Sequence, residues 1–159
     1  MKHIEIERKY KVNRNLWAKL DKPVGDRILQ GFLSTDKKRT IRVRVRNKRG
    51  SLTIKGITTN ISREEFEFPV PYDIAIAVIK KFASGVIEKI RYTIPFKGKD
   101  WEIDEFLGSN KGLIIAEVEL KSEDEVVVLP EWVEKEVSDN ARYYNVNLST
   151  YPYEKWKDK

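Results

Sequence analysis

Charged and apolar residues alternate in short segments of this chain, and the first of these segments is Ile4-Glu5-Ile6-Glu7-Arg8-Lys9-Tyr10, in which Arg8 shares the face of the apolar residues. Successive side chains of a β-strand point to opposite faces, so Glu5, Glu7 and Lys9 would share one face, opposite the isoleucines. On a single strand this pattern is usually a solvated face. The alternation recurs along the chain, however, and together with the turn signals between segments it predicts eight strands. They are expected at residues 2–12, 27–34, 39–48, 51–57, 63–70, 86–96, 99–106 and 112–121.

The predicted helices decide which face of these strands is buried. Helices are expected at residues 13–20, 72–83, 130–137 and 139–146, followed by a further turn near the C-terminus. The second of them is apolar over much of its circumference and must be buried against an apolar surface. The first and third predicted helices also need such a surface, because they carry Trp17 and Trp132. A barrel with its apolar faces inside would offer these helices no surface to dock on. We therefore predict an α+β fold, an eight-stranded antiparallel β-barrel (a tunnel) with a charged interior and helices packed on the outside.

Composition limits the chemistry that such a barrel can perform. The chain has 159 residues, of which 35% are charged, with no cysteine, a single histidine and a net charge of +6. These counts exclude disulfides, thiolate chemistry and any site that needs two imidazoles. No linker or internal repeat is visible, which favours one domain over residues 1–159. No apolar run approaches 18 residues, so we expect a cytoplasmic protein without a membrane partner. The positive charge alone does not distinguish an anionic ligand from nucleic acid or a merely basic surface.

The inward-facing candidates separate by sign. Carboxylates concentrate on the first, fifth, seventh and eighth predicted strands, and they are Glu5, Glu7, Glu65, Glu67, Glu102, Asp104, Glu117 and Glu119. Basic residues concentrate on the third, fourth and sixth strands, joined by Lys9 and Arg63, and they are Lys9, Arg42, Arg44, Lys55, Arg63, Lys89 and Arg91. Each pair alone is well explained as a surface salt-bridge ladder. Repeated around a closed barrel, the pattern instead predicts a carboxylate cluster for a divalent cation beside a basic wall for a polyanion. Oxygen ligands without cysteine favour Mg²⁺ or Mn²⁺ over zinc.

These motifs, in this order, resemble those of the CYTH superfamily, the triphosphate tunnel metalloenzymes. The first strand matches the Glu-x-Glu-x-Lys signature of that family. The other matches are Arg42 and Arg44, Lys55, the run Arg63, Glu65 and Glu67, the pair Lys89 and Arg91, Asp104, and the pair Glu117 and Glu119. The resemblance extends over nearly the whole chain, from this signature to Arg142-Tyr143-Tyr144-Asn145. One departure is Phe32, because relatives of this short type often carry a tyrosine there.

The resemblance implies a role for each residue. Glu5, Glu7, Glu117 and Glu119 would be the principal ligands of Mg²⁺ or Mn²⁺, with Asp104, Glu65 and Glu67 supporting them. Substrate phosphates would be bound by Lys9, Arg42, Arg44, Lys55, Arg63, Lys89 and Arg91, although Arg63 is equally well placed for the rim. The residues implied in catalysis are Glu5, Glu7, Lys9, Lys89 and Arg91. The short helix around residues 142–147 would close or border one mouth of the tunnel.

The implied activity is metal-dependent hydrolysis of a small-molecule triphosphate, first of all inorganic tripolyphosphate to pyrophosphate and phosphate. Hydrolysis of nucleoside or thiamine triphosphates, and cyclisation of ATP to cyclic AMP, remain open, because the same tunnel residues would serve each reaction. A non-catalytic module that binds polyphosphate or RNA ends is the alternative from another class. It would need the basic wall but not the carboxylates. No specific nucleic-acid partner is expected, since the basic residues alternate inward without an aromatic stacking platform. The oligomeric state is open, a homodimer included.

Overall fold

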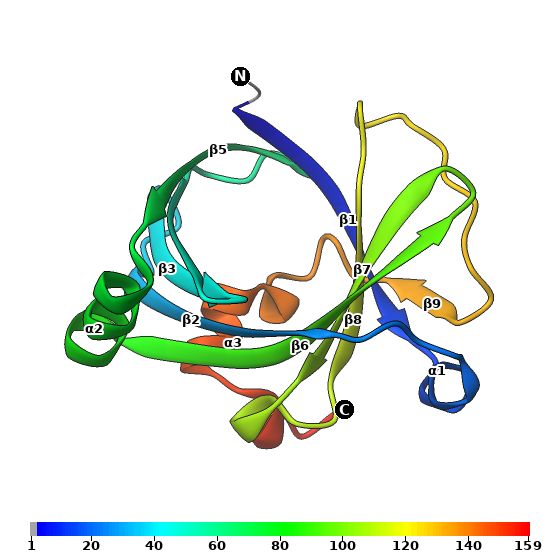
Figure 1. The fold of residues 1–159 in the computed structure, drawn as a ribbon. Helices are drawn as coiled ribbons and strands as arrows, with labels where there is room; N and C mark the ends of the chain where they lie inside the picture. Colours follow the sequence, from blue (N-terminus) through cyan, green and yellow to red (C-terminus); the bar gives the residue numbers. More distant parts are fainter. Residues whose placement is uncertain (1–2) are drawn as a thin grey trace.

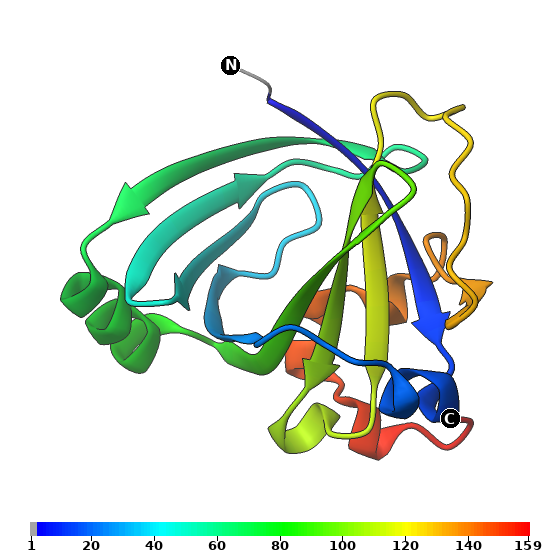
Figure 2. The ribbon, with the colours of Figure 1, turned by 45° about the vertical axis from the view of Figure 1, so that its right-hand side comes forward.

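The protein folds as a closed antiparallel β-barrel in a computed structural model that describes residues 3–159 (Figures 1 and 2). Lys2, which belongs to the first predicted strand, lies outside these residues. The strands are β1 (Ile4–Val12), β2 (Asp26–Ser34), β3 (Thr40–Arg46), β4 (Arg49–Lys55), β5 (Ser62–Val70), β6 (Gly85–Phe96), β7 (Lys99–Phe106), β8 (Ile114–Glu119) and β9 (Val133–Glu136). The helices are α1 (Arg14–Lys19), α2 (Tyr72–Phe82) and α3 (Asn145–Thr150), with 3₁₀ turns η1 (Gly108–Asn110), η2 (Ala141–Tyr143) and η3 (Tyr153–Lys155).

The sheet closes at β1. The strand order is β5-β4-β3-β2-β6-β7-β8-β1-β9, and an additional pairing of β1 with β5 joins the two sides into an eight-stranded barrel, with β9 added beyond it. This closure is short, since it pairs Ile4–Ile6 with residues 62–64. Residues 7–11 of β1 pair with β8 on its other edge, in a register that places Glu7 opposite Glu119. β1 therefore lies at the seam of the barrel, held on both edges.

Apolar side chains cover the outside of the barrel, as the alternation predicts. Val43 and Val45 of β3 pack against Ala75 and Ile79 of α2. Gly31 lets this helix approach β2 closely, because a Cβ there would lie 2.8 Å from the Cβ of Ala83. On the opposite side an aromatic cluster covers the outer faces of β1, β7 and β8, and Trp17 of α1 joins it through an edge-on contact with Trp132. Its buried members are Tyr10, Val12, Trp17, Trp101, Ile103, Ala116, Val118, Leu120 and Trp132.

The interior is charged along much of its length and apolar at one end. There, Phe32, Ile87 and Phe106 point inward and pack with Leu148 of α3. Figure 1 shows α3 within the ring of strands. Close contact between Gly85 at the start of β6 and Ser149 of α3, where an added Cβ would lie 2.7 Å from Ser149 Oγ, places the helix over this end. Helix α3 therefore covers the barrel at the end where β6 begins.

Two predicted helices are wrong. Residues 133–136 of the predicted helix 130–137 form strand β9, which pairs with β1 at Tyr10 and Val12. The composition of Val133–Glu136 does not decide between helix and strand, and the open edge of β1 supplies the hydrogen-bond partners that make it a strand. The predicted helix 139–146 is instead the short turn η2 followed by α3, which begins only at Asn145. Trp132 is buried as expected, but from a loop. Within residues 3–159 no helix has the length and apolar character needed to span a membrane.

Candidate active site

The tunnel contains a polar cavity of about 270 Å³. Its lining includes eight cationic and seven carboxylate side chains, so the cations nearly balance the carboxylates before any ligand binds. The cations are Lys9, Arg42, Arg44, Arg46, Lys55, Arg63, Lys89 and Arg91, and the carboxylates are Glu5, Glu7, Glu65, Glu67, Glu102, Glu117 and Glu119. The structure thus brings every predicted site residue except Asp104 to one cavity. At the end away from α3 the cavity continues into a wider vestibule between the β3–β4 turn and the start of α2, which shares Arg44, Arg46 and Glu67 with it.

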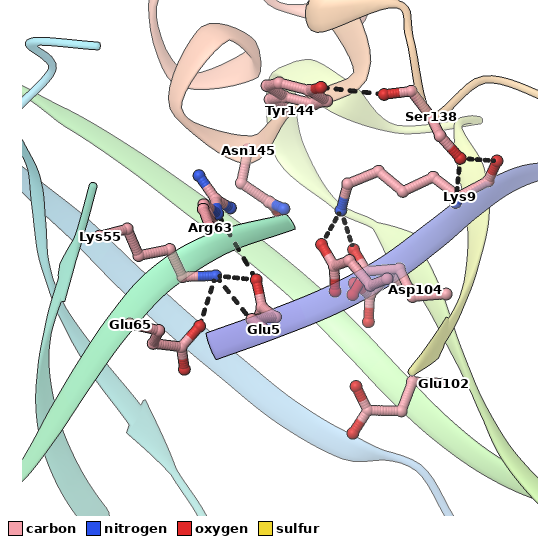
Figure 3. A network of polar contacts seen from close by, with 12 residues as sticks. Glu5, Lys9, Lys55, Arg63, Glu65, Glu102, Asp104, Ser138, Tyr144 and Asn145 are labelled. Carbon is pink, nitrogen blue, oxygen red and sulfur yellow. Dashed lines mark hydrogen bonds and ion pairs between the residues drawn. The ribbon is translucent and has the colours of Figure 1, made fainter. Parts of the chain in front are cut away.

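Lys55 is the centre of one ion-pair cluster, where β4 faces β1 and β5 (Figure 3). Its Nζ lies 2.9 Å from Glu5 Oε1 and 3.0 Å from Glu65 Oε2. Arg63 Nε lies 3.5 Å from the same Glu5 oxygen. Arg63 therefore faces the cavity and is not confined to the rim. Burial raises the pKa of the Glu65 carboxyl, but Glu5 and Lys55 outweigh burial through hydrogen bonding and charge, so the net pKa is lowered.

Lys9 joins a second cluster on the other side of the tunnel. Its Nζ lies 2.6 Å from Glu117 and 3.0 Å from Glu7. Burial opposes the charged form of this ammonium, but the two carboxylates outweigh burial and raise the pKa of Lys9 above its ordinary value. Arg91 contacts Glu117 at 3.3 Å and Glu102 at 2.6 Å. Burial alone would raise the pKa of Glu117, whereas Lys9, Arg91 and Lys89 hold it well below the usual range.

Asp104, which is expected to be a supporting metal ligand, lies behind this second cluster. The side chain of Asp104 is fully buried and does not line the cavity. Its Oδ1 accepts from Arg91 Nε at 2.7 Å, and its Oδ2 accepts from Arg91 and from Lys89 Nζ, each at 2.7 Å. Burial opposes ionisation of this carboxyl, but Arg91 and Lys89 hold the pKa of Asp104 below normal. Asp104 is thus placed to aim two cations into the tunnel.

Lys89 shares its counterion with Arg91. Burial, together with the neighbouring guanidinium, lowers the pKa of Lys89 to about 8, although Asp104 and Glu117 favour its charged form. The ammonium also donates to Asn145 Oδ1 at 3.1 Å. At neutral pH Lys89 is therefore charged, but its ammonium is more acidic than that of an ordinary lysine.

Some residues at the site carry no alternating signal in the sequence. The backbone N–H of Lys9 donates to Ser138 Oγ at 2.9 Å, and the N–H of Val137 donates to Lys9 O at 2.8 Å. Tyr144 donates to Ser138 O at 2.9 Å and lines the cavity. The segment before α3 thus fixes the backbone of β1 at Lys9. Gln30 of β2 is fully buried, and its amide has no hydrogen-bond partner in the part of the chain that the structure describes.

The cavity's donors suit a hard divalent cation, because they are carboxylate oxygens. Within residues 3–159, no three acidic, histidine or cysteine side chains converge closely enough to hold a metal ion by themselves. Mg²⁺ is commonly bound by one or two carboxylates together with substrate phosphates and water, so an incomplete protein cage suits an ion that arrives with a phosphorylated ligand. The chemistry of the donor set therefore fits Mg²⁺ or Mn²⁺ in the presence of such a ligand.

Comparisons with known proteins agree with this geometry. The CYTH domain family matches residues 3–150. An inorganic triphosphatase of Acetivibrio thermocellus is 44% identical over 97% of this chain and 98% of its own length. An inorganic triphosphatase of Nitrosomonas europaea is 30% identical over 76% of this chain and 82% of its own. A crystal structure of an inorganic triphosphatase superposes with a TM-score of 0.65 at 28% identity, covering 91% of this chain and 93% of that chain.

Proposed function

The chain belongs to the CYTH domain family, and on that premise we propose that it is an inorganic triphosphatase that hydrolyses tripolyphosphate to pyrophosphate and phosphate inside the tunnel. The observation that carries this proposal is one narrow cavity lined by eight cations and seven carboxylates. A module that only binds anions would have no use for so many carboxylates, since each weakens the hold on a polyanion. Carboxylates beside a basic wall suit a reaction in which a divalent cation accompanies the phosphates.

The cations bind the phosphates and stabilise the charge that develops during hydrolysis. Lys9, Lys55, Arg63, Lys89 and Arg91 project into the cavity from four different strands. Arg42 and Arg44 add guanidiniums from β3. As water attacks phosphorus and the bridging P–O bond breaks, negative charge grows on the departing pyrophosphate, where fixed cations stabilise it. Because Lys9 and Lys55 are paired with cavity carboxylates before substrate arrives, phosphate oxygens replace those carboxylates as their partners, whereas Lys89 and Arg91 keep Asp104.

The carboxylates released by this exchange would hold Mg²⁺ or Mn²⁺. The ligands would be drawn from Glu5, Glu7, Glu117 and Glu119, with Glu65 and Glu67 supporting them. The ion, when bound, supplies neutralisation of phosphate charge and a more acidic attacking water. Asp104 is assigned a positioning role instead, because its oxygens are already occupied by Arg91 and Lys89.

Removal of divalent cations tests the function directly. With Mg²⁺ or Mn²⁺ the purified protein is expected to release phosphate from tripolyphosphate, and an excess of EDTA is expected to stop the release. Restoring the metal should restore activity, which controls for loss of the fold. Turnover and products are compared for tripolyphosphate, ATP and thiamine triphosphate side by side, and the comparison ranks the substrates. Metal-independent binding of polyphosphate without turnover of any of these triphosphates would contradict the enzyme.

The lowered pKa of Lys89 predicts a loss of catalytic efficiency in alkaline solution. The groups that face this ammonium are Asp104, Arg91, Glu117 and Asn145. Because the free enzyme loses the Lys89 charge as pH rises through about 8, kcat/KM for tripolyphosphate is expected to fall above that pH. A bound polyanion favours the charged form, so kcat should begin to fall only at higher pH. A pH profile of both constants measures this difference.

The variant Lys89→Arg is the control for this pH dependence, since its guanidinium remains protonated throughout the range. Its alkaline limb is expected to move to higher pH, whatever its absolute rate. An identical limb in the wild type and in this variant would show that another group titrates there.

A further inference from the structure

Asn145 is a neutral residue at the end of the tunnel that α3 covers. It is the first residue of α3 and lines the cavity together with Tyr144 and Val146. In Figure 3 its side chain points from the helix toward strand β1, which carries Glu5 and Lys9. No alternating pattern marks this residue, because it comes from a helix that covers the barrel end.

The contact with Lys89 fixes the orientation of the Asn145 amide. An ammonium group can only donate hydrogen bonds, so the atom 3.1 Å from Lys89 Nζ must be the carbonyl oxygen Oδ1. The NH₂ group then lies on the other side of the amide. Within residues 3–159 this Nδ2 donates to no protein acceptor, although the side chain lines a cavity rich in charge. An unused donor pair in such a cavity suits an anionic oxygen.

The position of Asn145 along the tunnel indicates which part of a ligand it would meet. On β6, Lys89 lies nearer than Arg91 to Gly85, the residue that α3 covers. The opposite end opens into the vestibule beside Asp26 and the β3–β4 turn. A polyanion that enters from the vestibule therefore presents its leading end to Asn145 and Lys89.

We propose that Asn145 is a substrate-contacting residue, whose Nδ2 donates a hydrogen bond to the leading phosphate of the triphosphate while Oδ1 holds Lys89 in place. This inference deepens the proposed function and rests on it for the identity of the ligand. A neutral donor adds affinity for a phosphate oxygen without requiring a counterion when the tunnel is empty. It therefore differs from Lys9 and Lys55, each of which must exchange a carboxylate for a phosphate.

Two variants separate the donor from the acceptor. Asn145→Asp keeps an oxygen for Lys89 but loses the donor, whereas Asn145→Ala loses both. Binding of tripolyphosphate is measured by isothermal titration calorimetry in EDTA, where no turnover occurs, and KM and kcat are measured with metal. Both variants are expected to weaken binding by about tenfold or more, the value of one hydrogen bond to a charged group, with KM rising accordingly. Asn15→Asp makes the same change on the exposed side of α1 and should bind as the wild type does.

The possible results test the role of Asn145 separately from the proposed triphosphatase activity. Wild-type affinity in Asn145→Asp together with weakened binding in Asn145→Ala would reduce Asn145 to a positioning residue and overturn the donor role. Wild-type affinity in Asn145→Ala would overturn it as well, because any weakening in Asn145→Asp would then come from the negative charge that this variant adds beside the phosphate. Weakened binding in both, in a protein whose wild type hydrolyses no triphosphate, would support Asn145 as a ligand contact while the hydrolase itself fails. Thermal unfolding identifies a variant that does not fold, and the nearly isosteric Asn145→Asp then carries the test.

Discussion

Glu7→Gln is expected to lower kcat for tripolyphosphate hydrolysis by about 100-fold or more, while the fold remains intact. The substitution keeps the size of the side chain and removes a carboxylate that faces the cavity beside Lys9. If Glu7 is a metal ligand, its loss removes part of a charge stabilisation worth several kcal/mol in the transition state, and each 1.36 kcal/mol corresponds to about tenfold in rate. Steady-state phosphate release over a range of Mg²⁺ or Mn²⁺ concentrations measures the effect. The variant should also need more metal to reach half of its maximal rate.

Glu64→Gln provides the matched control for Glu7→Gln. Glu64 lies on β5 and is exposed on the outer face of the barrel, where it is opposite Ile4. Its substitution changes the net charge of the protein equally but does not touch the cavity. Wild-type kinetics are expected for it. An active Glu7→Gln enzyme with an unaltered metal requirement would place the metal site elsewhere in the tunnel.

Asp104→Asn is expected to damage both stability and activity. The substitution leaves Arg91 and Lys89 buried without their shared carboxylate, and removal of one partner of a buried pair typically costs about 3–5 kcal/mol. For a chain of this size each kcal/mol lowers Tm by roughly 2–4 °C, so a decrease of about 10 °C is expected. Activity should fall as well, because two cations lose the group that aims them. Calorimetric unfolding and steady-state kinetics measure the two effects.

Glu102→Gln is the control for Asp104→Asn, because it also removes a carboxylate that contacts Arg91 but one that is not fully buried. Glu102 approaches the same guanidinium at 2.6 Å, but 37% of its side chain is exposed. A partly exposed pair contributes about 1 kcal/mol or less, so Tm should change little. Equal destabilisation by both substitutions would show that the buried position of Asp104 has no special role. A stable but inactive Asp104→Asn protein would instead favour direct participation in the site.

The alternation of side chains predicts the walls of the tunnel well, because a period of two places every second residue of a strand on one face. This is why β1, β3, β5 and β8 present their charges to the cavity as expected. The same period does not predict depth. Asp104 and Glu102 share a face of β7, yet the first is sealed beneath two cations and the second lies in the cavity. Depth depends on how far each position lies from the barrel ends and on the length of neighbouring side chains.

The end of the tunnel could not be predicted by the same reasoning. β2 contributes Ile28, Gln30 and Phe32 to the interior, so it carries no charged pattern. The run from Val133 to Glu136 fits a short helix or a strand equally well by composition, and only the open edge of β1 decides between them. The position of α3 is set by contacts with Phe32 and Ile87, which are distant in the sequence. Local patterns contain no information about such partners.

The seam at β1 has a consequence for biosynthesis. Lys9 of β1 pairs in the cavity with Glu117, which lies 108 positions later in the chain, and Asn145 is synthesised later still. While the chain emerges from the ribosome, Glu7 and Lys9 of β1 therefore have no partner on β8 until that strand has been synthesised. Folds with such long-range pairings are intrinsically slow to form. Glu5, Glu7 and Lys9 keep one face of the waiting strand hydrated. The two halves of the tunnel should accordingly assemble in one late step, when nearly the whole chain is available.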